Sequence, residues 1–301
     1  MKGFRQCEIC GSNRWEIVYQ GDIRDGAYGN FVANAIVAKC LNCSIERLEE
    51  SFCPNENIYD TSEYRKKLQQ DISINEYQKN DNQLQKYVFS IINKNILKNK
   101  IIADIGCAGG SFLDQISEIT SKNIAIEPCE LYKKPLLEKG YSVYSNFIDA
   151  ESECAKEVDF AFSFQVIEHV RNPREFLENI RLLLKPNGKL LISTPNRRDI
   201  LMNLLPDTFP SFFYRVVHRW YFDAQSLSEC AIKSGFKIEK IQPIHRYGLS
   251  NILSWLRDGK PTGHKNFPQI NSTIDKYWRD YLEKNEQSDC LFILLSLDKN
   301  I

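Results

Sequence analysis

A short apolar run that ends in a glycine-rich turn decides the fold of this chain. The stretch reads Ile101-Ile102-Ala103-Asp104-Ile105-Gly106-Cys107-Ala108-Gly109-Gly110. A helical pattern over Ser111–Ile119 follows it, and then a second apolar run, Asn123–Ile126, which ends at Glu127-Pro128. Short apolar runs that alternate with helical patterns predict parallel strands joined by crossover helices. We therefore expect the glycine turn and Glu127 at the carboxyl ends of neighbouring strands.

This pair of features is typical of a site for a nucleoside-containing cofactor. A glycine turn lets a ligand approach the backbone, and a carboxylate accepts hydrogen bonds from the ribose hydroxyls. The dinucleotide fingerprint Gly-x-Gly-x-x-Gly fits poorly, because Ala108 and Ser111 stand at its third and sixth places. An NAD-dependent dehydrogenase therefore stays a weaker alternative.

The same alternation continues downstream. Helical patterns cover Glu175–Leu184 and Ala224–Ser234, Lys185–Gly188 reads as a turn, and Gly235 stops the second helix. Further strand patterns cover Val158–Phe164, Lys189–Ser193, Phe236–Ile244 and Asp289–Leu297. These patterns predict an α/β protein with a sheet of several buried strands.

Several blocks along this part of the chain carry a resemblance to a known family. They are Asp104–Gly110, Glu127-Pro128, Val166–Val170, Leu184–Gly188 and Ser193–Asn196. In this order they resemble the class I S-adenosylmethionine-dependent methyltransferases. The resemblance implies a doubly wound, mostly parallel, Rossmann-like seven-stranded sheet whose last two strands pair in opposite directions. It also implies S-adenosyl-L-methionine as the cofactor, which has no phosphate to cradle and so fits the imperfect dinucleotide fingerprint.

The resemblance assigns cofactor-binding roles to individual residues. It implies that Glu127 with Pro128 holds the ribose hydroxyls, that Asn146 lies near the adenine, and that Gln165 ends a strand beside the sulfonium. The methionine part would lie against Asp104, Gly106, Cys107, Ala108 and Gly110. The family usually has a second glycine where Ala108 stands, and we expect Ala108 to keep a right-handed backbone, in which a Cβ costs nothing.

Four cysteines near the N-terminus form two pairs of identical spacing, Cys7-x-x-Cys10 and Cys40-x-x-Cys43. Two such pairs can form a closed tetrahedral thiolate cage, which is typical of structural zinc. The segments Ser12–Gln20 and Phe31–Lys39 between the pairs are candidate strands, with Gly21, Gly26 and Gly29 between them. A module this small buries little core, so zinc binding would supply much of its folding free energy. Unrelated cysteines, or a redox pair, are the alternatives.

Together these features predict the domain organisation. We expect a zinc-ribbon-like module over residues 1–53, a helical linker over 54–99, and the methyltransferase domain over 100–301. The segment 245–288 is too long for an ordinary loop and is predicted either as a substrate-binding cap or as a structural insertion with its own helices.

The composition excludes several classes of protein. The chain has 301 residues, with 39 Lys and Arg balanced by 39 Asp and Glu. A chain without basic excess is a poor candidate for nucleic-acid binding. No apolar run is long enough for a membrane span, and Met1–Cys10 lacks the apolar core of a signal peptide, so we expect a cytoplasmic location. The oligomeric state stays open.

Methyl transfer is a displacement at a sulfonium carbon, and aligning the acceptor can supply about 7–11 kcal/mol of the barrier. A hydroxyl acceptor also needs a base, for which His169 and His218 are the leading candidates, ahead of His245 and His264. Arg246 or Lys260 could hold an anionic acceptor.

The resemblance to methyltransferases with a zinc-ribbon head implies a small-molecule acceptor. The methylated atom would be a hydroxyl oxygen of a sugar, a nucleotide-sugar or another precursor of polysaccharide biosynthesis. Two alternatives stay open. One is a quinone-like or other small hydroxyl metabolite. The other is a zinc scaffold that binds the cofactor without catalysis.

Overall fold

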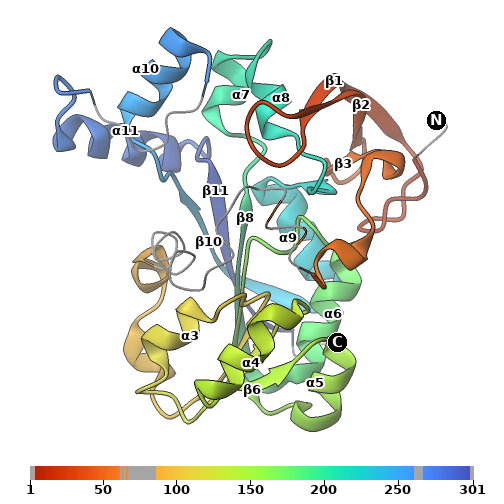
Figure 1. Cartoon of the computed structure of the whole chain (residues 1–301), viewed down its shortest axis with the longest axis vertical. Helices are drawn as coiled ribbons and strands as arrows, with labels where there is room; N and C mark the ends of the chain where they lie inside the picture. The colour runs from red at the N-terminus through yellow and green to blue at the C-terminus, as the bar shows by residue number, and fades with distance from the viewer. Residues whose placement is uncertain (1–3, 62, 64–65, 67–85, 261–266, 299–301) are drawn as a thin grey trace.

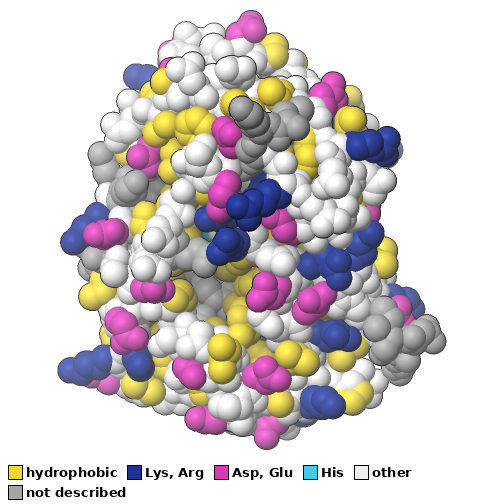
Figure 2. Space-filling model, turned by 90° about the vertical axis from the view of Figure 1, so that its right-hand side faces the viewer, with side chains coloured by type: hydrophobic (Ala, Val, Ile, Leu, Met, Phe, Trp, Pro, Cys, Tyr) yellow, Lys and Arg dark blue, Asp and Glu magenta, His cyan; other side chains and the backbone are white. Residues whose placement is uncertain are grey.

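The computed structural model describes residues 4–61, 63, 66, 86–260 and 267–298. Within these ranges the chain forms a four-stranded sheet near the N-terminus and a seven-stranded central sheet (Figure 1). Basic and acidic side chains are interspersed over the face that Figure 2 shows, in keeping with the balanced charge of the sequence. None of the helices in these ranges has both the length and the apolar character that a membrane span requires.

The central sheet has the strand order β10-β11-β8-β7-β4-β5-β6. β4, β5, β6, β7 and β8 run parallel, and β11 pairs antiparallel with both β8 and β10. The strands are β4 (Ile101–Ile105), β5 (Lys122–Ile126), β6 (Ser142–Tyr144), β7 (Val158–Phe164), β8 (Leu184–Pro195), β10 (Phe236–Ile244) and β11 (Cys290–Leu297). The predicted α/β class, with a mostly parallel seven-stranded sheet and an antiparallel last pair, is confirmed.

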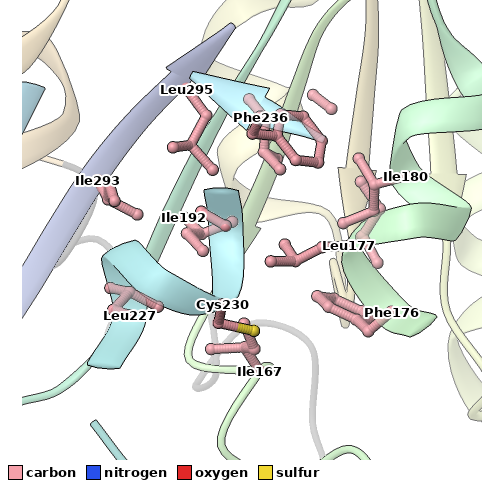
Figure 3. Close-up of a cluster of buried hydrophobic side chains, with 14 of the residues drawn as sticks. Ile167, Phe176, Leu177, Ile180, Ile192, Leu227, Cys230, Phe236, Ile293 and Leu295 are labelled. Carbon is pink, nitrogen blue, oxygen red and sulfur yellow. The ribbon is translucent and has the colours of Figure 1, made fainter. Parts of the chain in front are cut away.

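Helices cover both faces of this sheet because successive strand residues point to opposite sides. In β4, Ile102 packs into one apolar cluster and Ala103 into the other. The helices are α3 (Ser111–Ile116), α4 (Glu130–Glu138), α5 (Phe147–Cys154), α6 (Pro173–Leu183) and α9 (Ala224–Lys233). Figure 3 shows the core on one face, where side chains of α6 and α9 pack against side chains of β8 and β11. The helices contribute Phe176, Leu177, Ile180, Leu227 and Cys230, and the strands contribute Ile192, Ile293 and Leu295.

One local prediction is wrong. Lys185–Gly188 is not a separate turn but part of β8, which begins at Leu184. The pairing of β8 with β7 shifts between Val158 and Phe160, and this irregularity takes up the extra residues. A Cβ on Gly188 would lie 3.0 Å from the Val158 carbonyl oxygen, so the two backbones approach closely there.

The N-terminal sheet combines residues far apart in the sequence. β1 (Trp15–Arg24) and β2 (Phe31–Cys40) form the predicted antiparallel pair, although Gly21 lies inside β1 rather than between the strands. β3 (Glu46–Leu48) pairs with β2 on one side and with β9 (Trp220–Tyr221) on the other. β9 therefore joins the cysteine-containing segment to the second half of the chain.

A third apolar cluster strengthens this junction. It takes side chains from β1, β2 and β3, from the segment 201–221, and from α10 (Leu249–Asp258). Trp255 of α10 packs edge-on against Phe209 of α8 (Phe209–Phe213), with ring centroids 5.3 Å apart. α7 (Ile200–Leu204) precedes α8. The N-terminal strands thus bury one face against the rest of the protein and share its core.

The segment 245–288 contains α10 and α11 (Ser272–Lys284), and the predicted helices of an insertion are present. The role of the segment 245–288 as a cap over the acceptor stays a prediction, and so do the domain boundaries. The short 3₁₀ helices are η1 (Glu50–Phe52), η2 (Glu56–Ile58) and η3 (Lys94–Leu97). Much of the predicted linker, with Tyr64 and Tyr77, lies outside the described residues, as does His264.

Candidate functional site

The glycine turn and Glu127 meet at the carboxyl edge of the central sheet, as the sequence predicts. The backbone N–H of Ala108 donates to Oε2 of Glu127 at 2.8 Å, and the N–H of Cys129 donates to Oε1 at 2.9 Å. The N–H of Gly106, at the start of the turn, also donates a hydrogen bond to the Ile126 carbonyl at 2.8 Å. A carboxylate oxygen can accept more than one hydrogen bond. Glu127 can therefore brace the turn and still receive ribose hydroxyls.

The turn depends on left-handed backbone conformations. Gly106 has φ +73°, Ala108 has φ +46° and Gly110 has φ +76°. The expectation that Ala108 stays right-handed is therefore wrong, because this turn bends Ala108 so that its N–H points at Glu127. A Cβ on Gly106 would lie 2.4 Å from Cγ2 of Val166, so glycine is required where the loop after β7 packs on the turn.

Replacing Ala108 by glycine is expected to stabilise the protein. A left-handed alanine costs about 1–2 kcal/mol, whereas the extra freedom that glycine brings to the unfolded chain costs about 0.4–1 kcal/mol. The net gain in the free energy of unfolding is up to about 1.6 kcal/mol, measurable by urea denaturation. Ala155→Gly is the matched control, because Ala155 has φ −56° and should lose stability. Equal losses in both variants would contradict the strain at Ala108.

The other residues with predicted cofactor roles lie around this turn. Asp104 is buried near the end of β4, and Pro128 is half-buried directly after β5. Cys107 is buried, and burial raises the pKa of its thiol well above the usual range, so it is an unreactive small residue. Asn146 is the N-cap of α5 and accepts a hydrogen bond from Asp149 N, which places it after β6 on the neighbouring strand.

The loop after β7 and the segment before β9 bring together three titratable groups from two distant parts of the chain. Glu168 and His169 follow Gln165, whose amide donates to Oγ of Ser193 at 3.3 Å. His218 precedes β9, and its ring lies edge-on to that of His169 with centroids 4.7 Å apart. One ligand atom from each of Glu168, His169 and His218 lies within 4.8 Å of the others.

Glu168 and His218 have perturbed pKa values because they are buried. Burial raises the pKa of Glu168 to about 7, although hydrogen bonds and nearby arginines oppose the rise. Burial, with Arg215 nearby, lowers the pKa of His218 well below its usual value. His218 is therefore neutral at physiological pH. Such clusters of perturbed groups are typical of functional sites.

The remaining histidine and cation candidates serve structure or lie apart. His245 is buried, and its Nδ1 accepts from Asp289 N at 3.2 Å. Arg246 forms an ion pair with Asp289 in which Nε and Oδ2 are 2.5 Å apart. Lys260 is exposed. None of these three contacts the Glu168 cluster through an observed hydrogen bond among the described residues.

The four N-terminal cysteines converge as predicted. All their sulfur atoms lie within 4.8 Å of one another, with Cys7 and Cys43 3.6 Å apart and Cys10 and Cys40 3.4 Å apart. Sulfurs around a tetrahedral zinc with bonds of about 2.3 Å are about 3.8 Å apart. The cage therefore fits a zinc ion.

The two cysteine pairs also share one turn geometry. Gly11 N donates to the Cys7 carbonyl at 2.8 Å, and Ser44 N donates to the Cys40 carbonyl at 2.9 Å. Gly11 and Ser44 are both left-handed, with φ +75° and +61°. Two unrelated cysteine pairs would have no reason to repeat this geometry, which supports a common metal.

Comparison with known proteins settles the family. A family model described as a methyltransferase domain matches residues 78–241, more than half of the chain. The chain belongs to this methyltransferase family. The predicted class I S-adenosylmethionine-dependent methyltransferase is thereby confirmed, together with its cofactor.

The methyltransferase has curated relatives named ubiquinone biosynthesis O-methyltransferase. The protein from Actinobacillus pleuropneumoniae is 30% identical over 114 residues, which cover 34% of this chain and 49% of the relative. The protein from Haemophilus ducreyi is 29% identical over 184 residues, which cover 53% of this chain and 77% of the relative. The chain thus spans about half of the first relative and about three quarters of the second.

A solved structure has a similar fold. It is a chain from the complex between the Haloferax volcanii Trm112 methyltransferase activator and a methyltransferase, with a TM-score of 0.51 and 10% identity. The match covers 74% of this methyltransferase and 93% of that chain. At this identity the similarity concerns the fold alone.

Two residues of the methyltransferase now stand out: Glu168, to which the sequence assigns no role, and Tyr59, for which it leaves pocket lining or packing between domains open. Glu168 lies in the block that carries the family resemblance, and a carboxylate directly before a histidine at a strand end is a signal that could have marked it. The hydroxyl of Tyr59 lies 3.2 Å from Nδ1 of His169 and donates to the Val217 carbonyl at 3.1 Å. Only the tertiary structure reveals that contact.

Proposed function

We propose that this methyltransferase transfers a methyl group to a hydroxyl oxygen of a small, quinone-like acceptor. The observation that carries the proposal is the cluster of Glu168, His169 and His218, of which Glu168 and His169 lie on the loop that packs against the glycine turn. Curated relatives named ubiquinone biosynthesis O-methyltransferase support an oxygen acceptor and a quinone-like compound. They favour the quinone alternative over the sugar acceptor that the zinc-headed resemblance suggests.

The cofactor would lie across the carboxyl ends of β4 and β5. The ribose hydroxyls would donate to Glu127, and the methionine part would lie along the turn that begins at Gly106, near Asp104. The adenine would lie toward Asn146, and the sulfonium would face Gln165. The family resemblance implies these assignments, and the hydrogen bonds between the turn and Glu127, with the order of the strands, support them.

The transfer itself is an in-line displacement. An acceptor oxygen forms a bond to the methyl carbon, while the sulfur–carbon bond breaks and leaves its electron pair on sulfur. The acceptor hydroxyl must lose its proton during this step. His169 and His218 lie where that proton would leave. Nδ1 of His169 faces the Val217 carbonyl at 2.7 Å, so this nitrogen carries the proton and Nε2 is the basic atom.

The test is turnover with defined acceptors. We expect the purified chain with S-adenosylmethionine to convert a prenylated dihydroxybenzene to its O-methyl ether, detected by mass spectrometry as a CH₂ gain with S-adenosylhomocysteine formed in equal amount. Nucleotide-sugars form the second arm. Methylation of the nucleotide-sugars without methylation of the dihydroxybenzene would overturn the quinone proposal. Cofactor binding without product in any arm would instead indicate the scaffold.

A further inference from the structure

We propose that Glu168, His169 and His218 bind one divalent transition-metal ion, separate from the four-cysteine site. The three side chains offer a carboxylate oxygen and two imidazole nitrogens whose ligand atoms all lie within 4.8 Å. The cluster is well enclosed, with relative exposures of 1% for Glu168 and 5% for His218. Two imidazoles and one carboxylate are a common ligand set for such ions, with coordination positions left open.

Glu168 has an oxygen atom that needs a partner. Its Oε2 accepts a hydrogen bond from the Thr194 hydroxyl at 3.0 Å. Its Oε1 is buried and has no hydrogen-bond partner among the described residues, and it lies 4.0 Å from Nε2 of His169. Burying an unpaired carboxylate oxygen is costly. A cation between Oε1 and Nε2 would remove that cost.

His169 is oriented as a metal ligand. Its Nδ1 donates to the Val217 carbonyl at 2.7 Å, and a carbonyl can only accept. This bond makes Nε2 the nitrogen with the lone pair and turns that lone pair toward Glu168. Metal-bound histidines typically donate their second ring nitrogen to a carbonyl or carboxylate in this way.

The backbone holds the two ligand segments together. The N–H groups of Arg219 and Trp220 donate to the Glu168 carbonyl at 2.8 and 3.2 Å. These bonds fix the position of His218, which directly precedes Arg219. β9 in turn pairs with β3, so the cysteine-containing sheet supports the segment that carries His218. These hydrogen bonds and the β3–β9 pairing hold both ligand-bearing loops in place, as a preorganised site requires.

The positive charges around the cluster make the Glu168 carboxylate the most important ligand for metal affinity. Arg24 and Arg215 act on His218 electrostatically and disfavour a further positive charge there. Glu168 is the anionic ligand, so we expect its loss to weaken metal binding most. Nitrogen and oxygen donors suit manganese, iron, cobalt or zinc, whereas the cysteine cage prefers zinc.

The metal deepens the proposed function and rests on it for its chemical role. The acceptor hydroxyl would bind an open position, and the metal would lower the pKa of that hydroxyl. With the metal bound, Nε2 of His169 is a ligand and no longer a base, so the O–H bond would break with release of the proton to water, and the oxygen would form its bond to the methyl carbon. The sulfur–carbon bond would break with its electron pair going to sulfur, so the ion itself is unchanged.

The experiment measures metal binding without an acceptor. The zinc-loaded full chain is titrated with Mn²⁺ and followed by electron paramagnetic resonance. We expect one saturable site per chain, and a Kd that rises 10–100-fold in Glu168→Gln and at least tenfold in His218→Asn. Glu178→Gln is the matched control, because Glu178 is a surface carboxylate of α6 with 41% side-chain exposure. Bound zinc and affinity for S-adenosylhomocysteine verify that each variant folds.

A second measurement needs no variant. Co²⁺ added to the zinc-loaded wild type should give a visible spectrum without the sulfur-to-cobalt charge-transfer bands that the cysteine cage would produce. Unchanged Mn²⁺ affinity in Glu168→Gln, no saturable Mn²⁺ binding in the wild type, or cobalt bound only through sulfur would each overturn the proposal. A chain that binds Mn²⁺ at this site but methylates no hydroxyl compound would refute the proposed function alone.

Discussion

Cys40→Ser is expected to release the zinc and unfold the N-terminal sheet. Zinc gives small zinc-finger peptides about 10–16 kcal/mol of apparent folding free energy. Here the module also packs on α8 and α10, so we expect a smaller loss, at least about 3 kcal/mol in the free energy of unfolding. Methyl transfer should be lost as well, because β3 supports β9 and the adjacent His218. Metal analysis, urea denaturation and turnover measure the three effects.

Cys53→Ser is the control for this experiment. Cys53 is half-buried, lies outside the cage and packs at the edge of the third apolar cluster, and its sulfur donates a weak hydrogen bond to the Glu49 carbonyl at 3.7 Å. It should keep one zinc per chain and wild-type stability to within about 1 kcal/mol. If Cys40→Ser lost its zinc yet unfolded at the wild-type urea midpoint, the structural role of the metal would be wrong.

Glu127→Ala should produce the largest loss of cofactor affinity. Each hydrogen bond between a ribose hydroxyl and a carboxylate contributes about 1.5–3 kcal/mol. Losing two of them raises the Kd for S-adenosylmethionine more than about a hundredfold, at about 1.4 kcal/mol per factor of ten. The variant also removes the acceptor for Ala108 N, which loosens the turn. Isothermal titration with S-adenosylmethionine and with S-adenosylhomocysteine measures the loss.

The control replaces a nearby carboxylate that has no role in the site. Glu130 begins α4, and its side chain is 66% exposed. Glu130→Ala should bind both ligands as the wild type does. Equal affinities in Glu127→Ala and Glu130→Ala, with both variants folded, would show that the ribose is held elsewhere.

Most strands of the central sheet were predictable because their signals are local, whereas β6 and the helices α4 and α5 beside it were not predicted. β4, β7 and β10 have the predicted bounds. β4 and β7 are short, mostly apolar runs that a glycine or polar residue terminates, whereas β10 mixes apolar and polar residues. The contact between the glycine turn and Glu127 was predictable for a related reason, because parallel strands place their carboxyl ends at one edge. The cysteine cage followed from spacing alone.

The errors arise where the local signal is ambiguous. Alanine usually keeps a right-handed backbone, but Ala108 is held left-handed by the hydrogen bond from its N–H to Glu127. Pro186-Asn187-Gly188 has turn chemistry, yet it forms part of β8 because the pairing with β7 accommodates an irregularity. In both cases a partner on another strand overrides the preference of the residue itself.

The sequence by itself determined the order of most strands and helices, the glycine turn with its acid, and the two cysteine pairs, because periodicity and spacing are properties of neighbouring residues. The tertiary structure decided that β9 completes the cysteine-containing sheet and that His218 lies beside Glu168 and His169. These contacts join distant segments and depend on how the packed core closes the chain. No pattern within either segment specifies them.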